Sequence, residues 1–117
     1  VKQKDGKIVS RSTSETMAQP IDADIAQKVK DLMLKTVQSG TGTRAQIPGV
    51  KVCGKTGTAE NELTVKDESK THAVFIGFAP YDDPQIAVSV VLEYAGGGGA
   101  NAAPIAREVI KTYLSQM

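Results

Sequence analysis

The chain has 117 residues, of which 40% are hydrophobic and 23% are charged, a composition typical of one globular domain with a modest core. A formal net charge of +1 argues against a nucleic-acid or membrane-surface footprint, and an aromatic content of 4% without tryptophan argues against a base-stacking platform. No apolar run approaches the ~20 residues that a membrane-spanning helix needs.

The start of the chain is abrupt. Val1 opens a polar segment without an initiator methionine, a signal peptide or a transmembrane run. We therefore interpret residues 1–117 as the C-terminal piece of a longer protein, and expect any targeting signal or membrane anchor upstream. The single cysteine, Cys53, has no partner in the chain and leaves the redox compartment open.

The first half of the chain predicts a lead-in and one helix. Residues 7–10 have the pattern of a short strand and residues 11–19 that of a polar loop. Apolar residues then recur at helical spacing, at Ile25, Val29, Leu32, Met33 and Val37. Asp22 is placed to cap this helix and Gly40 to end it, before a loop over residues 41–48.

Three runs in the second half have the composition of strands: residues 50–58, 73–79 and 86–93. The third run is almost continuously apolar, which favours a central place in the sheet. A polar segment over residues 61–70 is long enough to form the rim of a site, and residues 80–84 have the prolines and aspartates of a turn.

The C-terminal segment predicts a second helix. Residues 96–99 are all glycine and read as a flexible loop, and Pro104 suits the first turn of a helix. The apolar stripe of this helix is formed by Ile105, Val109, Ile110, Tyr113 and Leu114.

This order of elements predicts an α+β fold. The turns between the strands are short, so neighbouring strands are expected to be antiparallel. We expect a sheet of three or more strands with two helices packed on one face. The sequence has no internal repeat and no visible domain boundary, so residues 1–117 are treated as one domain.

Residues 49–60 satisfy two functional patterns. From Gly49 to Thr56 they read G-x-x-x-x-G-K-T, the phosphate-loop pattern, and from Lys55 to Thr58 they read K-T-G-T. A phosphate loop needs a strand before it and a helix after it. Here the preceding residues are not an apolar strand and the four variable positions are strand-like, so a nucleotide-binding module is the weaker alternative.

The K-T-G-T pattern suits a strand beside an active-site cleft. Lys55 offers a positive charge to an anionic substrate or a neighbouring serine. Thr56 and Thr58 alternate onto one side of a strand, where their hydroxyls can hydrogen-bond a carboxylate. Gly57 lets an extended substrate lie against the backbone, and the N–H of Thr58 can stabilise an oxyanion.

The wider setting of this motif resembles the C-terminal part of the transpeptidase domain of class B penicillin-binding proteins, of the penicillin-binding protein 2-like kind. The matching segments read S-G-T-G-T over residues 39–43, G-K-T-G-T-A-E over 54–60, H-A-V-F-I-G-F-A-P over 72–80 and A-A-P-I-A over 102–106. The resemblance covers nearly the whole chain from about residue 21 onward.

This resemblance implies a partial β-lactamase/transpeptidase-like fold and an acyl-serine mechanism, in which peptidoglycan stem peptides are cross-linked and penicillins acylate the same serine. It implies that Lys55 and Thr58 are catalytic and that Lys55, Thr56, Gly57 and Thr58 bind substrate, without a metal or a cofactor. It also implies a bacterial cell-wall protein at the outer face of the cytoplasmic membrane, with stem peptides and β-lactams as partners.

The family's other two motifs are missing from this chain. No serine has a lysine three positions later, and S-x-N is absent. The chain therefore supplies the substrate-binding strand but not the nucleophile, and we expect it not to acylate alone. A serine β-lactamase or a β-lactam sensor with the same motif is the nearest alternative, and an inactive interaction fragment is a third.

Other residues have ordinary interpretations. Cys53 is expected to be buried in a strand, and His72 to have a structural or solvent role. The Asp82–Asp83 pair reads as a turn, and Glu60 as a cleft or solvated residue. Arg44 and Lys66 are taken as surface charges.

A last expectation concerns exposed apolar surface. Separated from the rest of such a domain, the sheet is expected to expose an apolar face and an unpaired edge, and the chain to self-associate.

Overall fold

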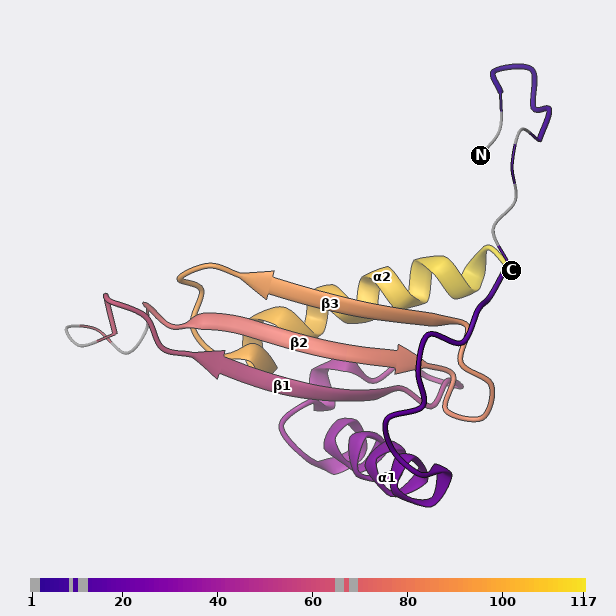
Figure 1. Ribbon diagram of the computed structural model, residues 1–117. Helices are drawn as coiled ribbons and strands as arrows, with labels where there is room; N and C mark the ends of the chain where they lie inside the picture. Colours follow the sequence, from indigo (N-terminus) through magenta and orange to yellow (C-terminus); the bar gives the residue numbers. More distant parts are fainter. Residues whose placement is uncertain (1–2, 9, 11–12, 65–66, 68–69) are drawn as a thin grey trace.

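The structure, a computed structural model, describes residues 3–8, 10, 13–64, 67 and 70–117. Figure 1 shows its elements in chain order: helix α1 (Ala23–Ser39), 3-10 helix η1 (Thr43–Ala45), strands β1 (Cys53–Ala59), β2 (His72–Ala79) and β3 (Ile86–Leu92), π-helix η3 (Gly98–Ala102) and helix α2 (Ala103–Ser115). Among the described residues, no helix is long and apolar enough to cross a membrane.

The three strands form one antiparallel sheet with β2 in the middle. Thr56 pairs with Phe75, and Phe75 pairs with Val90. Directly opposed residues of antiparallel strands point to the same face, so these three share one face of the sheet. Lys55 and its partner Ile76 lie one position along each strand and belong to the other face.

All three predicted strands are present. β1 begins at Cys53 and not at residue 50, because Ile47 and Val50 form an isolated bridge around a turn in which Gly49 has a φ of 79°. The prediction that the third strand is central is wrong for this sheet, since β3 lies at its edge. β3 is almost continuously apolar because one of its sides faces the core, while its other side also has apolar residues, of which Val91 is exposed.

Both predicted helices are present. Asp22 occupies the N-cap position of α1, although its side chain makes no capping hydrogen bond. At the other end, the N–H of Gly40 donates to the carbonyl of Thr36 at 3.1 Å. Pro104 lies in the first turn of α2, where a missing N–H costs no helical hydrogen bond.

The core lies on the face of the sheet that α2 covers. Phe75 is fully buried there, and the same cluster includes Ile110 of α2 and Val37 near the end of α1. A Cβ on Gly54 would lie 2.2 Å from Cζ of Phe75, and one on Gly77 would lie 2.7 Å from its Cε1. The absent side chains of these two glycines therefore leave the space that the Phe75 ring fills.

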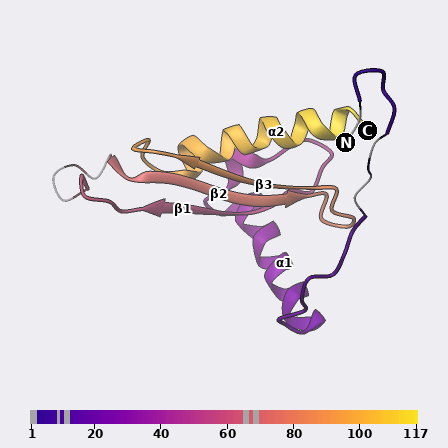
Figure 2. The same cartoon turned by 45° about the horizontal axis from the view of Figure 1, so that its top comes forward.

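The two helices meet the sheet differently, as Figure 2 shows: α2 lies along one side and α1 projects towards the other. The end of α1 joins the core, whereas Val29 and Met33 line a cavity of about 480 Å³ together with Phe78 and Ala87 on the opposite sheet face. The predicted α+β class, with an antiparallel three-stranded sheet and two helices, is confirmed. The predicted packing of both helices on one face holds for α2 and for the end of α1, whereas the rest of α1 lies against the other face.

Some predicted segments differ from the structure or lie partly outside the described residues. The flexible loop predicted for residues 96–99 is wrong in its second half, because Gly98 is buried and begins η3. The strand predicted for residues 7–10 and the loop predicted for residues 11–19 lie partly outside the described residues, at Val9 and at residues 11–12. The same is true of residues 65–66 and 68–69 in the predicted rim.

A polar cluster joins α1 to the turn between β2 and β3. The hydroxyl of Tyr81 donates to Oδ1 of Asp31 at 2.5 Å, and Nε2 of Gln27 donates to both the Tyr81 hydroxyl (2.8 Å) and Oδ1 of Asp31 (3.0 Å). Nζ of Lys30 lies 4.3 Å from the centre of the Tyr81 ring. Hydrogen bonds from Tyr81 and then Gln27 lower the pKa of Asp31, and the bond to Asp31 raises the pKa of Tyr81.

Tyr81→Phe is expected to lower the stability of the fold and to change its pH dependence. Because the folded pKa of Asp31 is depressed, its bond stabilises the fold above an unfolded pKa of about 3.9 and is lost as pH falls through the folded value. Because the folded pKa of Tyr81 is raised, its contribution is present below about pH 10 and is lost as pH rises through the folded value. Urea unfolding across pH measures both windows.

Tyr113→Phe is the matched control, since Tyr113 lies exposed on α2. It should leave the pH profile unchanged. A Tyr81→Phe profile that overlays the parent profile at both extremes of pH would contradict the proposed role of the cluster.

Candidate functional site

The K-T-G-T residues all lie on β1, the edge strand opposite β3. Lys55 and Thr58 are exposed, Gly57 is half-buried and Thr56 is buried. An edge strand leaves the backbone groups on its outer side unpaired within the sheet, which suits the binding of an extended peptide. The arrangement therefore has a free strand edge with an exposed cation beside it.

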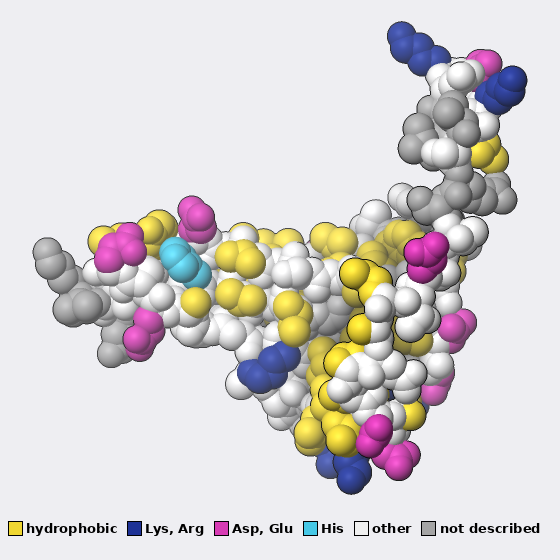
Figure 3. Space-filling view, viewed as in Figure 1, with side chains coloured by type: hydrophobic (Ala, Val, Ile, Leu, Met, Phe, Trp, Pro, Cys, Tyr) yellow, Lys and Arg dark blue, Asp and Glu magenta, His cyan; other side chains and the backbone are white. Residues whose placement is uncertain are grey.

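The side chain of Lys55 folds back on its own strand. Its Nζ donates to the backbone carbonyl of Thr56 at 2.5 Å. An ammonium group has three donors, so two remain for a ligand. The face of the sheet that Lys55 shares also carries Ile76 and Val91, which are exposed to 47% and 60%. In the view of Figure 3, hydrophobic side chains gather over the sheet.

Thr56 is tied to a second segment of the chain. Its Oγ1 lies 2.5 Å from Oγ1 of Thr41, and either hydroxyl can donate. Thr41 belongs to the loop between α1 and η1, fifteen residues earlier. The hydroxyl of Thr56 is therefore held by a partner, whereas Thr58 lies exposed further along β1.

The backbone of β1 is also held by η3. A Cβ on Gly98 would lie 2.4 Å from the carbonyl oxygen of Gly57, 3.0 Å from its nitrogen and 2.3 Å from the carbonyl oxygen of Val74. Only a residue without a side chain fits so close to two strands. At Gly57 itself a Cβ would make an ordinary contact, 3.6 Å from Cβ of Val74.

Several residues have the structural roles that were predicted from the sequence. Cys53 is fully buried in β1, and burial raises the pKa of its thiol. Nδ1 of His72 accepts the backbone N–H of Tyr94 at 3.0 Å, and the two rings meet edge to face at 4.6 Å. Asp83 lies in the predicted turn, where its carboxylate accepts a hydrogen bond from Gln85.

One more polar pair joins the residues that follow β1 and β3. The hydroxyl of Tyr94 donates to Oε1 of Glu62 at 3.0 Å. A hydrogen bond from the residue's own backbone, followed by the bond from Tyr94, lowers the pKa of the Glu62 carboxylate, and the bond to Glu62 raises the pKa of Tyr94. In the part of the chain that is described, no three His, Cys, Asp or Glu side chains gather closely enough to hold a metal ion.

Arg44 is more than a surface charge. Its Nη1 donates to the carbonyl of Ala100 in η3 at 3.2 Å, so it joins η1 to η3. Glu60 is exposed at the end of β1, and Lys66 lies outside the described residues.

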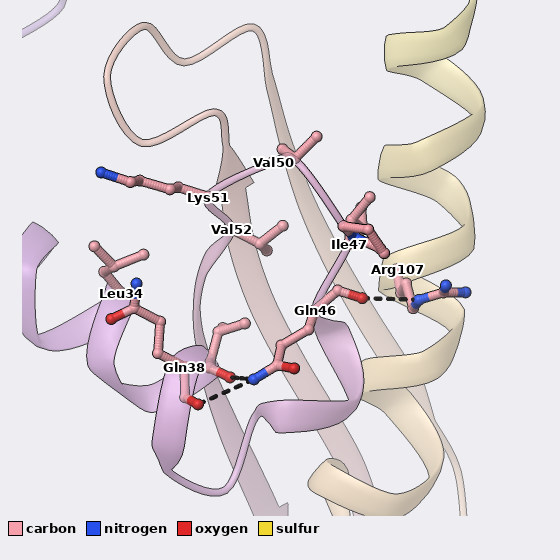
Figure 4. Close-up of a pocket in the computed structure, with 10 residues that line it drawn as sticks. Leu34, Gln38, Gln46, Ile47, Val50, Lys51, Val52 and Arg107 are labelled. Atoms are coloured by element: carbon pink, nitrogen blue, oxygen red, sulfur yellow. Dashed lines mark hydrogen bonds between the residues drawn. The ribbon is translucent and has the colours of Figure 1, made fainter.

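A cavity of about 430 Å³ lies away from the K-T-G-T residues, between α1, residues 46–52 and α2. Figure 4 shows the side chain of Gln46 donating to the carbonyls of Val37 and Gln38, both at 3.0 Å. Nε of Arg107 donates to the carbonyl of Gln46 at 2.9 Å. These hydrogen bonds pair the polar groups with one another and cap the end of α1. They connect α1, residues 46–52 and α2, so we assign this cavity a structural role.

The phosphate-loop alternative does not fit this geometry. A phosphate loop leads from its lysine and threonine directly into a helix. Here Lys55 and Thr56 lie in the interior of β1, which continues to Ala59. Gly54, the glycine directly before Lys55, lies in β1 and faces the Phe75 ring, so it does not belong to a loop that could surround a phosphate.

A comparison with protein families tests the predicted family. The family model described as the penicillin binding protein transpeptidase domain matches residues 2–111. The chain belongs to the penicillin-binding protein transpeptidase family. The predicted family is thereby confirmed.

Relatives and solved structures agree with this assignment. The chain is 44% identical over 89 residues to the peptidoglycan D,D-transpeptidase MrdA of Haemophilus influenzae, which covers 67% of the chain and 14% of that protein. It is 36% identical over 113 residues to the peptidoglycan D,D-transpeptidase PbpA of Mycolicibacterium smegmatis, covering 92% of the chain and 23% of that protein.

Among solved structures, the chain resembles penicillin-binding protein A from M. tuberculosis as a ceftriaxone acyl-enzyme complex, with a TM-score of 0.80 and 34% identity over 97% of this chain and 26% of that chain. A D,D-transpeptidase domain from Eggerthella lenta gives a TM-score of 0.79 at 35% identity, over 97% of this chain and 25% of that chain. The predicted partial transpeptidase fold is confirmed, and the chain spans about a quarter or less of these relatives.

The sequence placed Lys55, Thr56, Gly57 and Thr58 on one strand, and the structure has them there. It did not predict that the strand with these residues contacts Thr41 and Gly98, which come from two other segments. Thr41 and Gly98 belong to two conspicuous segments, S-G-T-G-T and the four-glycine run. Neither pattern indicates which residue of β1 its members contact.

Gly98→Ala is expected to destabilise the fold by about 1–3 kcal/mol, because the new Cβ has no room between β1, β2 and η3. Gly97→Ala is the matched control, since a Cβ at this neighbouring position meets nothing within 4 Å and its φ is −77°. Urea denaturation of the two variants measures the difference. Equal midpoints for Gly98→Ala and Gly97→Ala would contradict the close contact.

Proposed function

We propose that β1 binds the D-alanyl-D-alanine end of a peptidoglycan stem peptide within a serine-type D,D-transpeptidase. The observation that carries this proposal is the K-T-G-T sequence on a free sheet edge, with Lys55 and Thr58 exposed, in a chain of the penicillin-binding protein transpeptidase family. The names of the relatives, which are peptidoglycan D,D-transpeptidases, support it.

The proposed reaction belongs to the longer protein. A serine oxygen attacks the carbonyl carbon between the two D-alanines, the peptide bond breaks, and the terminal D-alanine leaves with the proton from the serine. The amine of a neighbouring stem peptide then attacks the acyl-serine ester, forms the cross-link and returns a proton to the serine. Residues 1–117 contain no S-x-x-K or S-x-N motif, so the nucleophile lies outside this sequence.

Each residue of the strand has a proposed role. The ammonium group of Lys55 attracts the substrate carboxylate or assists the serine, and Gly57 lets the peptide lie against the strand. The hydroxyls of Thr56 and Thr58 donate to the carboxylate, and the N–H of Thr58 donates to the oxyanion formed by attack.

We propose β-lactams as further ligands of the longer protein, because solved relatives are described as acyl-enzyme complexes with ceftriaxone, imipenem and penicillin G. A β-lactamase or sensor fragment is the less favoured alternative, since the named relatives are transpeptidases. The proposed location is the outer face of the bacterial cytoplasmic membrane, where peptidoglycan is cross-linked, with an anchor elsewhere in the longer protein.

Titration of the chain with N-acetyl-D-Ala-D-Ala, followed by amide NMR shifts, tests the proposal. We expect shifts centred on β1, and a dissociation constant raised about tenfold by Lys55→Met through loss of a charged hydrogen bond. Lys111→Met on the exposed face of α2 is the control and should bind like the parent chain. Fluorescent penicillin should not label the chain covalently.

The L-alanyl-L-alanine isomer supplies the stereochemical control. Equal shifts with the D and L isomers, or a Lys55→Met variant that binds as well as the parent, would remove the support for a substrate strand. Covalent labelling by penicillin would show that a nucleophile is present after all.

Self-association is also proposed for this chain. Ile76 and Val91 expose apolar surface on the sheet, Ile25 and Leu32 do so on α1, and β3 is an edge strand without a charge or a proline. Such edges pair readily with another copy because nothing repels the second strand.

We expect concentration-dependent dimers or larger species in sedimentation velocity, and a shift towards monomer in Val91→Lys. Val109→Lys, which places the same charge on an exposed position of α2, is the control and should leave the association unchanged. A single monomeric species at high concentration would contradict self-association.

A further inference from the structure

We infer that Thr41 is a positioning residue for the K-T-G-T strand: its hydroxyl donates to Thr56, so that the single hydroxyl proton of Thr56 points towards the ligand carboxylate. This inference rests on the proposed function of β1. It adds a residue from outside the motif, contributed by the loop that follows α1.

The first support is the geometry of the hydroxyl pair. The two Oγ1 atoms lie 2.5 Å apart, in a part-buried position. Thr56 is only 8% exposed, so a ligand can contact little of its surface. Under that restriction, the direction of the hydroxyl decides whether it offers a proton or a lone pair.

The second support is the rigidity of the loop that carries Thr41. The N–H groups of Gly40 and Gly42 both donate to the carbonyl of Thr36, at 3.1 and 2.9 Å. On its other side, a Cβ at Gly99 would lie 2.4 Å from the carbonyl oxygen of Thr41. The end of α1 and the η3 backbone therefore fix Thr41 between them.

The third support is the inventory of hydrogen-bonding groups. A threonine hydroxyl has one proton and two lone pairs. If Thr56 donated to Thr41, it would present only a lone pair to a carboxylate, which repels it. If Thr41 donates, Thr56 keeps its proton for the ligand, and the two aligned hydroxyls polarise each other. The chain Thr41 to Thr56 to carboxylate is the arrangement that suits an anionic ligand.

The test uses the 117-residue chain with two probes, N-acetyl-D-Ala-D-Ala and the same dipeptide with a C-terminal amide. Thr41→Val removes the hydroxyl while keeping the shape of the side chain, and Thr41→Ser restores the hydroxyl. Thr43→Val is the matched control, because Thr43 is an exposed threonine two residues away in η1. NMR gives the dissociation constants and the χ1 rotamer of Thr56.

We expect Thr41→Val to weaken binding of the carboxylate probe about fivefold, the value of one ordinary hydrogen bond, and to leave binding of the amide probe unchanged. Thr41→Ser should bind within about twofold of the parent, and Thr43→Val like the parent. A Thr41→Val variant that keeps parent affinity, or that weakens both probes equally, overturns the inference. Thr41→Ala serves as a second removal of the hydroxyl if the valine variant does not fold.

Failure of the proposed function gives a different result. If the parent chain binds neither probe, β1 is not a substrate strand in this chain, and the rotamer of Thr56 decides the positioning role alone. One χ1 rotamer in the parent and Thr41→Ser but averaged rotamers in Thr41→Val support that role. Identical rotamers in all three overturn it.

Discussion

The rest of the structure depends on the contact between the backbones of Gly98 and Gly57. Without a side chain at residue 98, η3 lies directly on β1 and β2, and α2 starts from a fixed point over the core face. The same contact places Gly99 beside the carbonyl of Thr41. One missing Cβ therefore connects the C-terminal helix, the edge strand and the loop after α1.

Three segments far apart in the sequence meet at the edge strand. The loop after α1 supplies the hydroxyl beside Thr56, η3 supports the backbone at Gly57, and β2 provides the sheet register that places Lys55 opposite Ile76. α1 is also held by the hydrogen bonds of Asp31 and Gln27 to Tyr81, in the turn between β2 and β3. A site built this way supports its strand at Thr56 and Gly57 and leaves the outer edge of the strand unpaired within the sheet.

Much of the fold was readable from local patterns. Apolar spacing predicted α1 and α2, and β-rich runs between turn residues predicted β1, β2 and β3 to within a few residues at their ends. The central place given to the third strand was wrong, because an apolar run does not say which strand lies beside it. The flexible loop predicted for the four-glycine run is wrong in its second half for a similar reason: glycine permits a mobile loop and a tight backbone contact equally, and only the neighbouring residues decide.

The sequence by itself determined the family, the K-T-G-T strand, the identity of the residues on it and the absence of an S-x-x-K nucleophile in this chain. These follow from residue types and short spacings, which need no knowledge of the fold. The tertiary structure alone decided that Thr41 holds Thr56, that η3 supports Gly57 and that Lys55 lies exposed on the sheet face opposite the core. Such contacts join residues 15 or more positions apart, and their partners are chosen by packing, which no local pattern records.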